Sequence, residues 1–299
     1  MAPTRPHRLL RSPSFLAAAT ILAIVVGLAI AAPYLGLADP NRQFRDALPA
    51  DGRPMGISAR FLLGTDALAH DELSRLIHGA RATLVVGFLG SGIAIAGALV
   101  AGLLAATAAS IRLPLPGGRG VQLSVEALVM RTVDVALAFP GILLAIALGA
   151  LLGASVALTV GLIAFLLWAP DTRIVHARAR QIWAAPWVEA AVATGIGRRR
   201  LLIRHVSPHL LPVALAYAAL GFAGAILIEA TLAFLGVGVP PSTPTWGRML
   251  AEHISWYRTD VRLVLVPGVA IAATVLAFSL LADAFRDALD PRSQERGAA

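Results

Sequence analysis

Long stretches without any charged residue constrain this chain more than any other feature of its sequence. Residues 82–111 and 135–170 contain no Asp, Glu, Lys or Arg. A membrane-spanning helix needs about 20 mostly apolar residues. The first stretch therefore suits one helix, and the second, which is too long for one, suits two helices joined by a tight turn. We expect an all-α polytopic membrane protein.

The composition agrees with this class and excludes several kinds of chemistry. Hydrophobic residues make up 58% of the chain and charged residues 14%, whereas soluble domains have about half and about a quarter. All 25 basic residues are arginine, and there is no cysteine, so disulfides and thiolate chemistry are excluded. Without lysine the chain cannot form a GxxxxGK[ST] phosphate-binding loop. We expect no cofactor in this chain, and any ATP and Mg²⁺ that drive it would be bound by other subunits. The net charge of +8 fits arginine-rich cytoplasmic loops rather than nucleic-acid binding.

The expected layout has six membrane-spanning helices. The spans comprise residues 15–38, 82–111, 126–150, 154–168, 210–235 and 263–282, with the tight turn near residues 149–153. Most arginines fall in segments that this layout puts in the cytoplasm, and an even number of spans puts both termini there. The layout divides the chain into an N-terminal tail, first helix and extracytoplasmic segment (1–80), a five-helix core (81–285) and a cytoplasmic tail (286–299).

The first apolar run has an alternative reading as a cleaved signal peptide. Ala29-Ile30-Ala31 has the small-x-small form of a cleavage site. The apolar core of a signal peptide is about 7–15 residues long, and this run is longer. We favour a retained helix.

The cytoplasmic loop at residues 171–209 contains a short segment with both helix ends marked. Pro186 suits the first helical position, Glu189 places a negative charge in the first turn, and Gly195 suits a left-handed C-terminal residue. A second short helix is expected over residues 198–206, and Pro208 marks the start of the next apolar run. Because a loop of this length between spans usually has a function, we interpret the helix pair as a docking element for a soluble partner.

Two acids, Glu229 and Asp134, are candidates for a functional role in the spans. Glu229 is the single acid deep in a span, and it has two readings: a substrate contact lining the pore, or a hydrogen bond to a neighbouring helix near the outer boundary. Asp134, at a helix end near Arg131, is expected to be interfacial and paired.

The histidines do not predict a metal site. His70 and His78 lack an obvious third ligand, so we expect surface histidines. His205 and His209 are four residues apart, but Pro208 lies between them and no carboxylate is adjacent. No metal-binding residue is therefore expected.

The docking loop resembles the EAA loop of ATP-binding-cassette importer permeases. The resemblance rests on Glu189-Ala190-Ala191, on Gly195 six positions after the glutamate, and on Pro208. In that family the loop forms a coupling helix that inserts into a groove on the cytoplasmic ATPase. This chain departs from the pattern at His205 and Ser207, where Ile and Leu are usual. The residues implied in ATPase coupling are Trp187, Glu189, Ala190, Ala191, Gly195, Arg198 and Pro208.

Further segments, in the right order along the chain, resemble the dipeptide/oligopeptide/nickel group of these permeases. They are Gly64-Thr65-Asp66, residues 71–77, Gly79-Ala80-Arg81, Ala138-Phe139-Pro140, residues 234–241, Thr245-Trp246-Gly247 and residues 286–292. Ala69 and His70 stand where that group generally has Gly and Arg. The short first outside segment resembles the C-type subunit, and the loop at residues 112–121 is longer than the family pattern.

The resemblance implies a MetI-like permease fold with a cytoplasmic coupling-helix loop at residues 187–208. It implies a bacterial inner membrane, a second permease subunit as heterodimer partner, two cytoplasmic ATP-binding subunits, an extracytoplasmic substrate-binding protein and surrounding membrane lipid. The expected function is permeation of dipeptides or oligopeptides, without catalysis by this chain; nickel chelates are the alternative substrate.

Two other classes of protein stay open. An ion-driven secondary carrier would need inverted repeats and ionisable groups at mid-membrane, and only Glu229 qualifies. A membrane anchor would recruit a cytoplasmic partner without transport. Co-purified ATPase subunits and ATP-dependent uptake would distinguish the permease from both.

Overall fold

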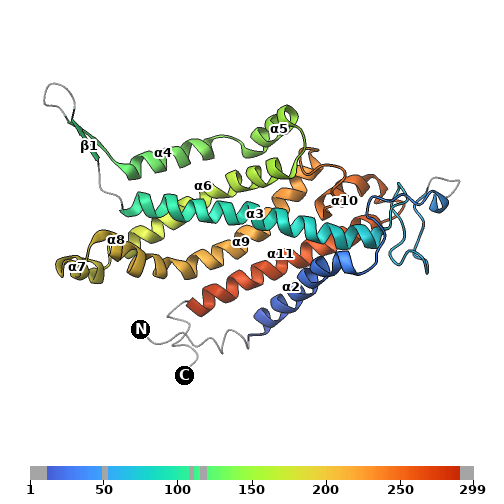
Figure 1. Ribbon diagram of the computed structural model, residues 1–299, viewed down its shortest axis with the longest axis horizontal. Helices are drawn as coiled ribbons and strands as arrows, with labels where there is room; N and C mark the ends of the chain where they lie inside the picture. Colours follow the sequence, from blue (N-terminus) through green and yellow to red (C-terminus); the bar gives the residue numbers. More distant parts are fainter. Residues whose placement is uncertain (1–11, 49–52, 108–110, 115–119, 290–299) are drawn as a thin grey trace.

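The computed structural model describes residues 12–48, 53–107, 111–114 and 120–289. Five long helices lie side by side in an elongated bundle: α2 (Pro13–Ala31), α3 (Glu72–Thr107), α6 (Val156–Trp183), α9 (Ser207–Phe234) and α11 (Arg262–Leu289) (Figure 1). The shorter elements are η1 (Ala32–Tyr34), η2 (Arg45–Ala47), β1 (Ile111–Pro114), β2 (Gly120–Leu123), α4 (Val125–Ala138), α5 (Gly141–Leu152), α7 (Pro186–Ala193), α8 (Arg198–Leu201), η3 (Leu202–Val206), α10 (Trp246–His253) and η4 (Ile254–Trp256).

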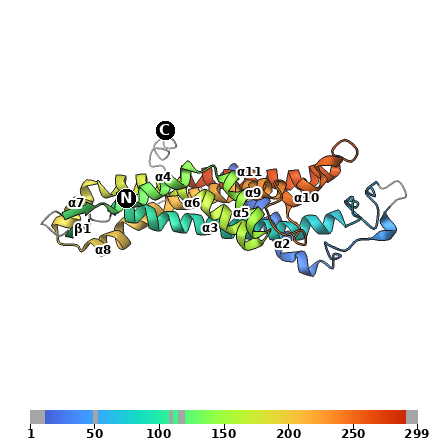
Figure 2. The ribbon, with the colours of Figure 1, turned by 90° about the horizontal axis from the view of Figure 1, so that it is seen from above.

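The two ends of the bundle carry different elements. One end, which we call the α7 end, carries α7, α8 and the β1–β2 hairpin, and the opposite end, the α10 end, carries α10 and residues 53–71 (Figures 1 and 2). The strands of the hairpin are antiparallel and pair Ile111 with Leu123 and Pro114 with Gly120. The two ends of the expected loop at residues 112–121 therefore form the paired strands of a hairpin. Its central residues 115–119 lie outside the described part of the chain.

The helices of the described residues confirm a polytopic membrane protein. Five are long and apolar enough to cross a membrane, and α4 and α5 together make a sixth candidate span that is bent by 77°. Several extend beyond the spans expected from sequence: α3 begins at Glu72 instead of residue 82, and α6 continues past residue 168 to Trp183. At a rise of 1.5 Å per residue the 36 residues of α3 span about 54 Å, well beyond the roughly 30 Å hydrocarbon core. The charge-free runs of the sequence therefore predict only part of the length of these helices.

The prediction of a single helix over residues 126–150 is wrong, because the structure has two helices there, α4 and α5. Phe139 adopts an extended conformation (φ −80°, ψ 130°), and α5 begins after Pro140. Proline disfavours the helical conformation of the residue before it, which accounts for the break. The turn expected near residues 149–153 is confirmed, because α5 ends at Leu152 and Gly153 has a φ of +77°.

Glycines allow α3 to approach α6 closely. A Cβ atom on Gly90 would lie 2.6 Å from Cγ2 of Ile163, and one on Gly102 would lie 2.7 Å from Cγ1 of Val175. Small residues at such contacts bring membrane helices together. α9 packs against α3, α6 and α11, and α2 packs against α11 and α3.

The Thr245-Trp246-Gly247 segment joins α10 to the bundle. Trp246 is only 2% exposed; its indole N–H donates to the Leu76 carbonyl at 2.9 Å and its backbone N–H donates to the Thr83 hydroxyl at 3.1 Å. Gly247 lies so close to α9 that a Cβ atom there would be 2.4 Å from Cα of Ala230. This segment therefore holds α3, α9 and α10 together.

Candidate functional site

α7 is a short helix with a defined beginning and end. Pro186 occupies its first turn, and Glu189 lies in the same turn, where a carboxylate interacts favourably with the helix dipole. After the helix, Gly195 has a φ of +81°, and its N–H donates to the Val192 carbonyl at 2.9 Å. The N–H of Ile196 donates to the Ala191 carbonyl at 3.2 Å, which completes a Schellman motif. The helix and the left-handed glycine predicted from sequence are both confirmed.

One face of α7 is anchored to the bundle. Val188 is buried, and the Trp187 ring stacks on His209 with ring centroids 5.2 Å apart and an interplanar angle of 27°. His209 lies in the first turn of α9. The stack therefore links the start of α7 directly to the start of a long core helix.

The other face of α7 is exposed. Glu189, Ala190 and Ala193 are exposed on the side opposite to Trp187 and Val188. Val192, four residues after Val188, is 55% exposed at the edge of this face, and Ala191 is half-buried. Within the described residues, Glu189 makes no side-chain hydrogen bond or ion pair. A helix that shows small and apolar residues and an unpaired carboxylate on one face is suited to receive a protein surface.

α7 is followed by a helical connection to α9. The sequence predicts a second short helix over residues 198–206, but α8 ends at Leu201 and continues through the π-helical turn η3 directly into α9, which corrects that prediction. Pro208 explains the wider turn, because proline has no N–H to donate and its ring clashes with the carbonyl four residues earlier. Leu201 and Val206 are fully buried, so this connection is anchored as well.

Arg198 ties the start of α8 to two other helices. Its guanidinium donates to the carbonyl of Thr107 at the end of α3 and lies over the Trp183 ring at the end of α6, 5.3 Å from the ring centroid. The sequence marks Arg198 as a coupling residue but gives no sign of Thr107, which is 91 positions away.

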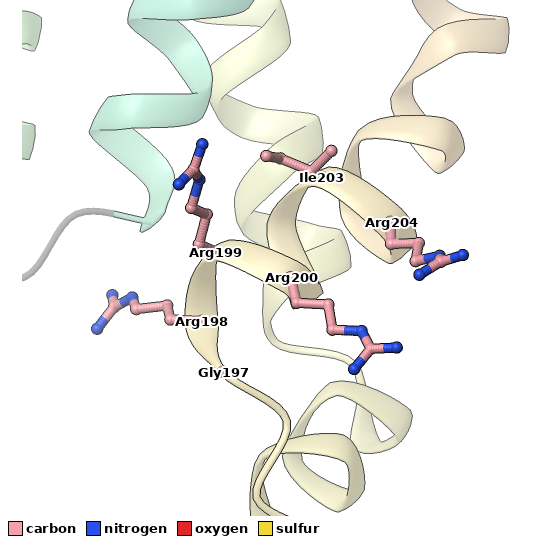
Figure 3. Close-up of a pocket in the computed structure, with 6 residues that line it drawn as sticks. All are labelled: Gly197, Arg198, Arg199, Arg200, Ile203 and Arg204. Carbon is pink, nitrogen blue, oxygen red and sulfur yellow. The ribbon is translucent and has the colours of Figure 1, made fainter.

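An open hollow of about 760 Å³ lies beside α8. Its lining includes four arginines, Arg198, Arg199, Arg200 and Arg204, with Gly197 and Ile203. Figure 3 shows the four guanidinium groups pointing in different directions rather than toward a common centre. The hollow is therefore a basic surface and not a cradle for a single small anion.

Comparison with known proteins decides the family. Residues 98–295 match the family described as "Binding-protein-dependent transport system inner membrane component". The chain belongs to this family.

Relatives of the permease have similar length. The di/tripeptide transport system permease protein DppC of Pseudomonas aeruginosa (strain UCBPP-PA14) is 38% identical over 270 residues, which are 90% of this chain and 85% of that protein. The dipeptide transport system permease protein DppC of Escherichia coli (strain K12) is 34% identical over 273 residues, 91% of this chain and 87% of that protein.

A solved structure supports the fold. A chain of the inward-facing MetNI methionine ABC transporter matches with a TM-score of 0.58 and 16% identity, over 72% of this chain and 96% of that chain. The predicted MetI-like permease fold is confirmed.

These matches give the permease its class. It is a multi-pass protein of the inner membrane and the permease component of an ABC importer. Such importers work with ATPase and substrate-binding-protein partners, and transport permeases are not enzymes.

Glu229 of the permease is fully buried within the chain. One of its carboxylate oxygens, Oε1, accepts a hydrogen bond from the Thr245 hydroxyl at 2.7 Å, and Thr245 is the N-cap of α10. This geometry corresponds to the second sequence reading, a hydrogen bond to a neighbouring helix. The pore-lining role stays a prediction.

Ion pairs near the α7 end hold α4 against α6. The sequence predicts that Asp134 is paired near Arg131; it is paired and exposed, but its partner is Arg173, at 2.6 Å. Glu126 accepts from Arg180 at 2.7 Å. The true partners lie on α6, which sequence spacing does not reveal.

Proposed function

We propose that this permease forms, with a second permease subunit, the translocation path of an ATP-driven peptide importer, and that α7 couples the path to two ATPase subunits. The observation that carries the proposal is the geometry of α7: one face is anchored through Val188 and Trp187, and the other is open around Glu189 and Ala190.

The connections of α7 suit a rigid lever. Only Ala184 and Ala185 separate it from α6, and the chain after Gly195 enters α8 and continues as helix into α9. A displacement of α7 would therefore tilt α6 and α9. An ATPase pair that closes on binding ATP would contact α7 differently in two states of the permease. This difference in contact free energy would switch the translocation path between the two sides of the membrane.

Separate roles follow for the loop residues. Glu189 would contact a cationic group of the ATPase, and Ala190 and Ala191 would permit close approach of its groove. Gly195 would set the turn after α7. Arg198, which contacts α3 and α6, would hold the start of α8 in place against these two helices. ATP and Mg²⁺ would bind only to the ATPase subunits, because this chain lacks the lysine of a phosphate-binding loop.

The layout in the membrane follows from the same proposal. If α7 meets cytoplasmic ATPases, the α7 end is cytoplasmic, and both termini lie in the cytoplasm. The α10 end then faces the substrate-binding protein. Peptides are the proposed substrates because the matched relatives are named as di/tripeptide and dipeptide permeases.

Reconstitution tests the proposal. The complete importer, assembled from this permease and the subunits encoded beside it, is placed in liposomes, and ATP-dependent uptake of a labelled dipeptide is measured together with ATP hydrolysis. We expect uptake in the wild type. Gly195→Asp should abolish it while the complex stays in the membrane, because a negative charge directly after the C-terminus of α7 opposes the helix dipole.

Two results would count against the proposal. Unchanged dipeptide uptake by Gly195→Asp would contradict the lever. Assembly with ATPase subunits but no uptake of any peptide by the wild type would contradict the substrate class while leaving the coupling role intact.

A further inference from the structure

Three buried side chains from separate elements meet at the α10 end of the permease. Asp66 comes from the segment before α3, Glu72 is the first residue of α3, and His253 is the last residue of α10. One potential ligand atom from each lies within 4.8 Å of the other two. Sequence spacing does not predict this group, because His253 is far from the other two residues along the chain.

Glu72 is the unusual member of the group. Its side chain is 0% exposed, and neither carboxylate oxygen has a hydrogen-bond partner among the described residues. Burying an ionised carboxylate without a partner is costly, so a native structure normally supplies a counter-charge or a metal.

Asp66 is held firmly in place. Its Oδ1 accepts from the backbone N–H groups of Leu68 and His70 at 2.9 and 2.8 Å, and its Oδ2 contacts His70 Nδ1 at 2.7 Å and the Arg75 guanidinium. Burial alone would raise the pKa of the Asp66 carboxyl, but its interactions with His253 and His70 and the charge of Arg75 lower that pKa well below its usual range. His70 is therefore a buried partner of Asp66, which corrects the expectation of a surface histidine.

The arginines beside the group already have carboxylate partners. Arg75 also pairs with Glu252 at 2.7 Å, Glu252 pairs with Arg248 at 2.7 Å, and Arg262 pairs with Asp260 at 2.6 Å. None of them hydrogen-bonds to the Glu72 carboxylate within the described residues.

We propose that Asp66, Glu72 and His253 form a binding site for one divalent transition-metal ion of the Zn²⁺ type. A mixed imidazole and carboxylate donor set suits Zn²⁺, whereas Ca²⁺ and Mg²⁺ need more oxygen ligands than this buried group offers. The ion would give the Glu72 carboxylate the partner that it lacks among the described residues. The backbone N–H groups on Asp66 act as the outer contacts that typically orient a ligating carboxylate.

Binding requires small movements. The Asp66 Oδ2 to His253 Nε2 distance is 3.8 Å, so the ligands need only close around the ion. Oδ2 already contacts both His70 and Arg75, and the metal replaces one of these contacts; the His70 ring is the more exposed and can turn away. The bound ion joins the segment before α3, the start of α3 and the end of α10, so it fixes the shape of the α10 end.

Metal content of the purified full chain tests the site. The chain in detergent is stripped with EDTA, incubated with ZnCl₂, desalted and analysed by elemental mass spectrometry. We expect about one Zn²⁺ per wild-type chain, and a Zn²⁺-dependent rise in the thermal unfolding temperature. Glu72→Gln and His253→Gln should each weaken Zn²⁺ binding by at least about 10-fold, the lower end of the loss seen even for outer-shell partners.

Matched controls keep the test specific. Glu126→Gln and His205→Gln change the same residue types at the other end of the bundle and should retain Zn²⁺ like the wild type. Glu72→Gln should keep or raise the unfolding temperature of the metal-free protein, because it removes a buried charge, which shows that loss of Zn²⁺ is not loss of folding. A wild-type chain that retains no more Zn²⁺ than Glu72→Gln would overturn the proposal, whether both retain none or both retain the same amount. Transport is not the readout, so this result is independent of the proposed coupling function.

Discussion

Replacing Gly195 by alanine tests whether the defined end of α7 matters for coupling. Gly195 has a φ of +81° and completes the Schellman motif, whereas Gly197, two residues later, has a φ of −59°. A Cβ atom at either position would meet no atom within 4 Å. The two alanine variants therefore differ in backbone strain and not in crowding.

The magnitude follows from the left-handed conformation. Alanine at a positive φ costs roughly 1–2 kcal/mol, whereas alanine at the ordinary φ of Gly197 costs little. The Gly195→Ala chain relieves the strain by unwinding the last turn of α7. Docking must then rebuild that turn, so the affinity for the ATPase falls by up to the same free energy, about 5- to 30-fold.

Binding of the purified ATPase subunit to the permease in nanodiscs measures this loss. We expect Gly195→Ala to bind about 5- to 30-fold more weakly than wild type, and Gly197→Ala to bind within about twofold. Gly195→Asn should fall between them, because asparagine adopts the left-handed conformation more readily than alanine. Equal affinities for the variants at Gly195 and Gly197 would refute the reasoning.

Two further predictions concern the bundle. Gly90→Ala should lower the stability of the permease by about 1–3 kcal/mol, because the added Cβ atom would lie 2.6 Å from Ile163. Gly92→Ala, on the same helix but with open space around it, should change the stability little, and unfolding in increasing SDS measures both variants. Trp246→Ala should lower the stability by about 3–5 kcal/mol, because it removes the buried ring and its hydrogen bond to Leu76. Trp246→Phe should lower the stability less, because it keeps most of the ring. Equal losses of stability for the two variants in the same assay would contradict the packing argument.

The sequence predicts the helices well where a local signal is strong. Uncharged stretches identify the spans, and Pro186 and Gly195 mark the ends of α7, because proline and glycine act on the backbone of their own residues. The lengths of α3 and α6 are not predictable in this way. Their ends contain charged residues, which oppose burial in lipid but not helix formation, so a charge-free run does not give the full length of the helix.

Tertiary contacts account for what the sequence does not predict. Asp134 pairs with Arg173 rather than with nearby Arg131, and Arg198 reaches the Thr107 carbonyl, because helix packing and not chain distance selects the partner. Pro140 is visible in the sequence as a breaker, but the bend of 77° between α4 and α5 depends on how α5 packs. The predicted fold class and family were nonetheless accessible, since motifs spread over the chain carry them.

The way α7 is attached determines which helices can respond to it. α6 is connected to α7 through two residues of the chain, and α9 is connected to it through α8 and η3 and also by the Trp187–His209 stack. α6 is held close to α3 at Gly90 and Gly102, and α9 packs on α3 and α11. A displacement of α7 would therefore reach α3 through α6 and reach α11 through α9. α2 packs on α3 and α11 and would follow them, because it has no attachment to α7 of its own among the principal helix contacts. We therefore expect coupling in this permease to depend on the stiffness of two helix ends, which Pro208 and Gly195 set from either side of α8.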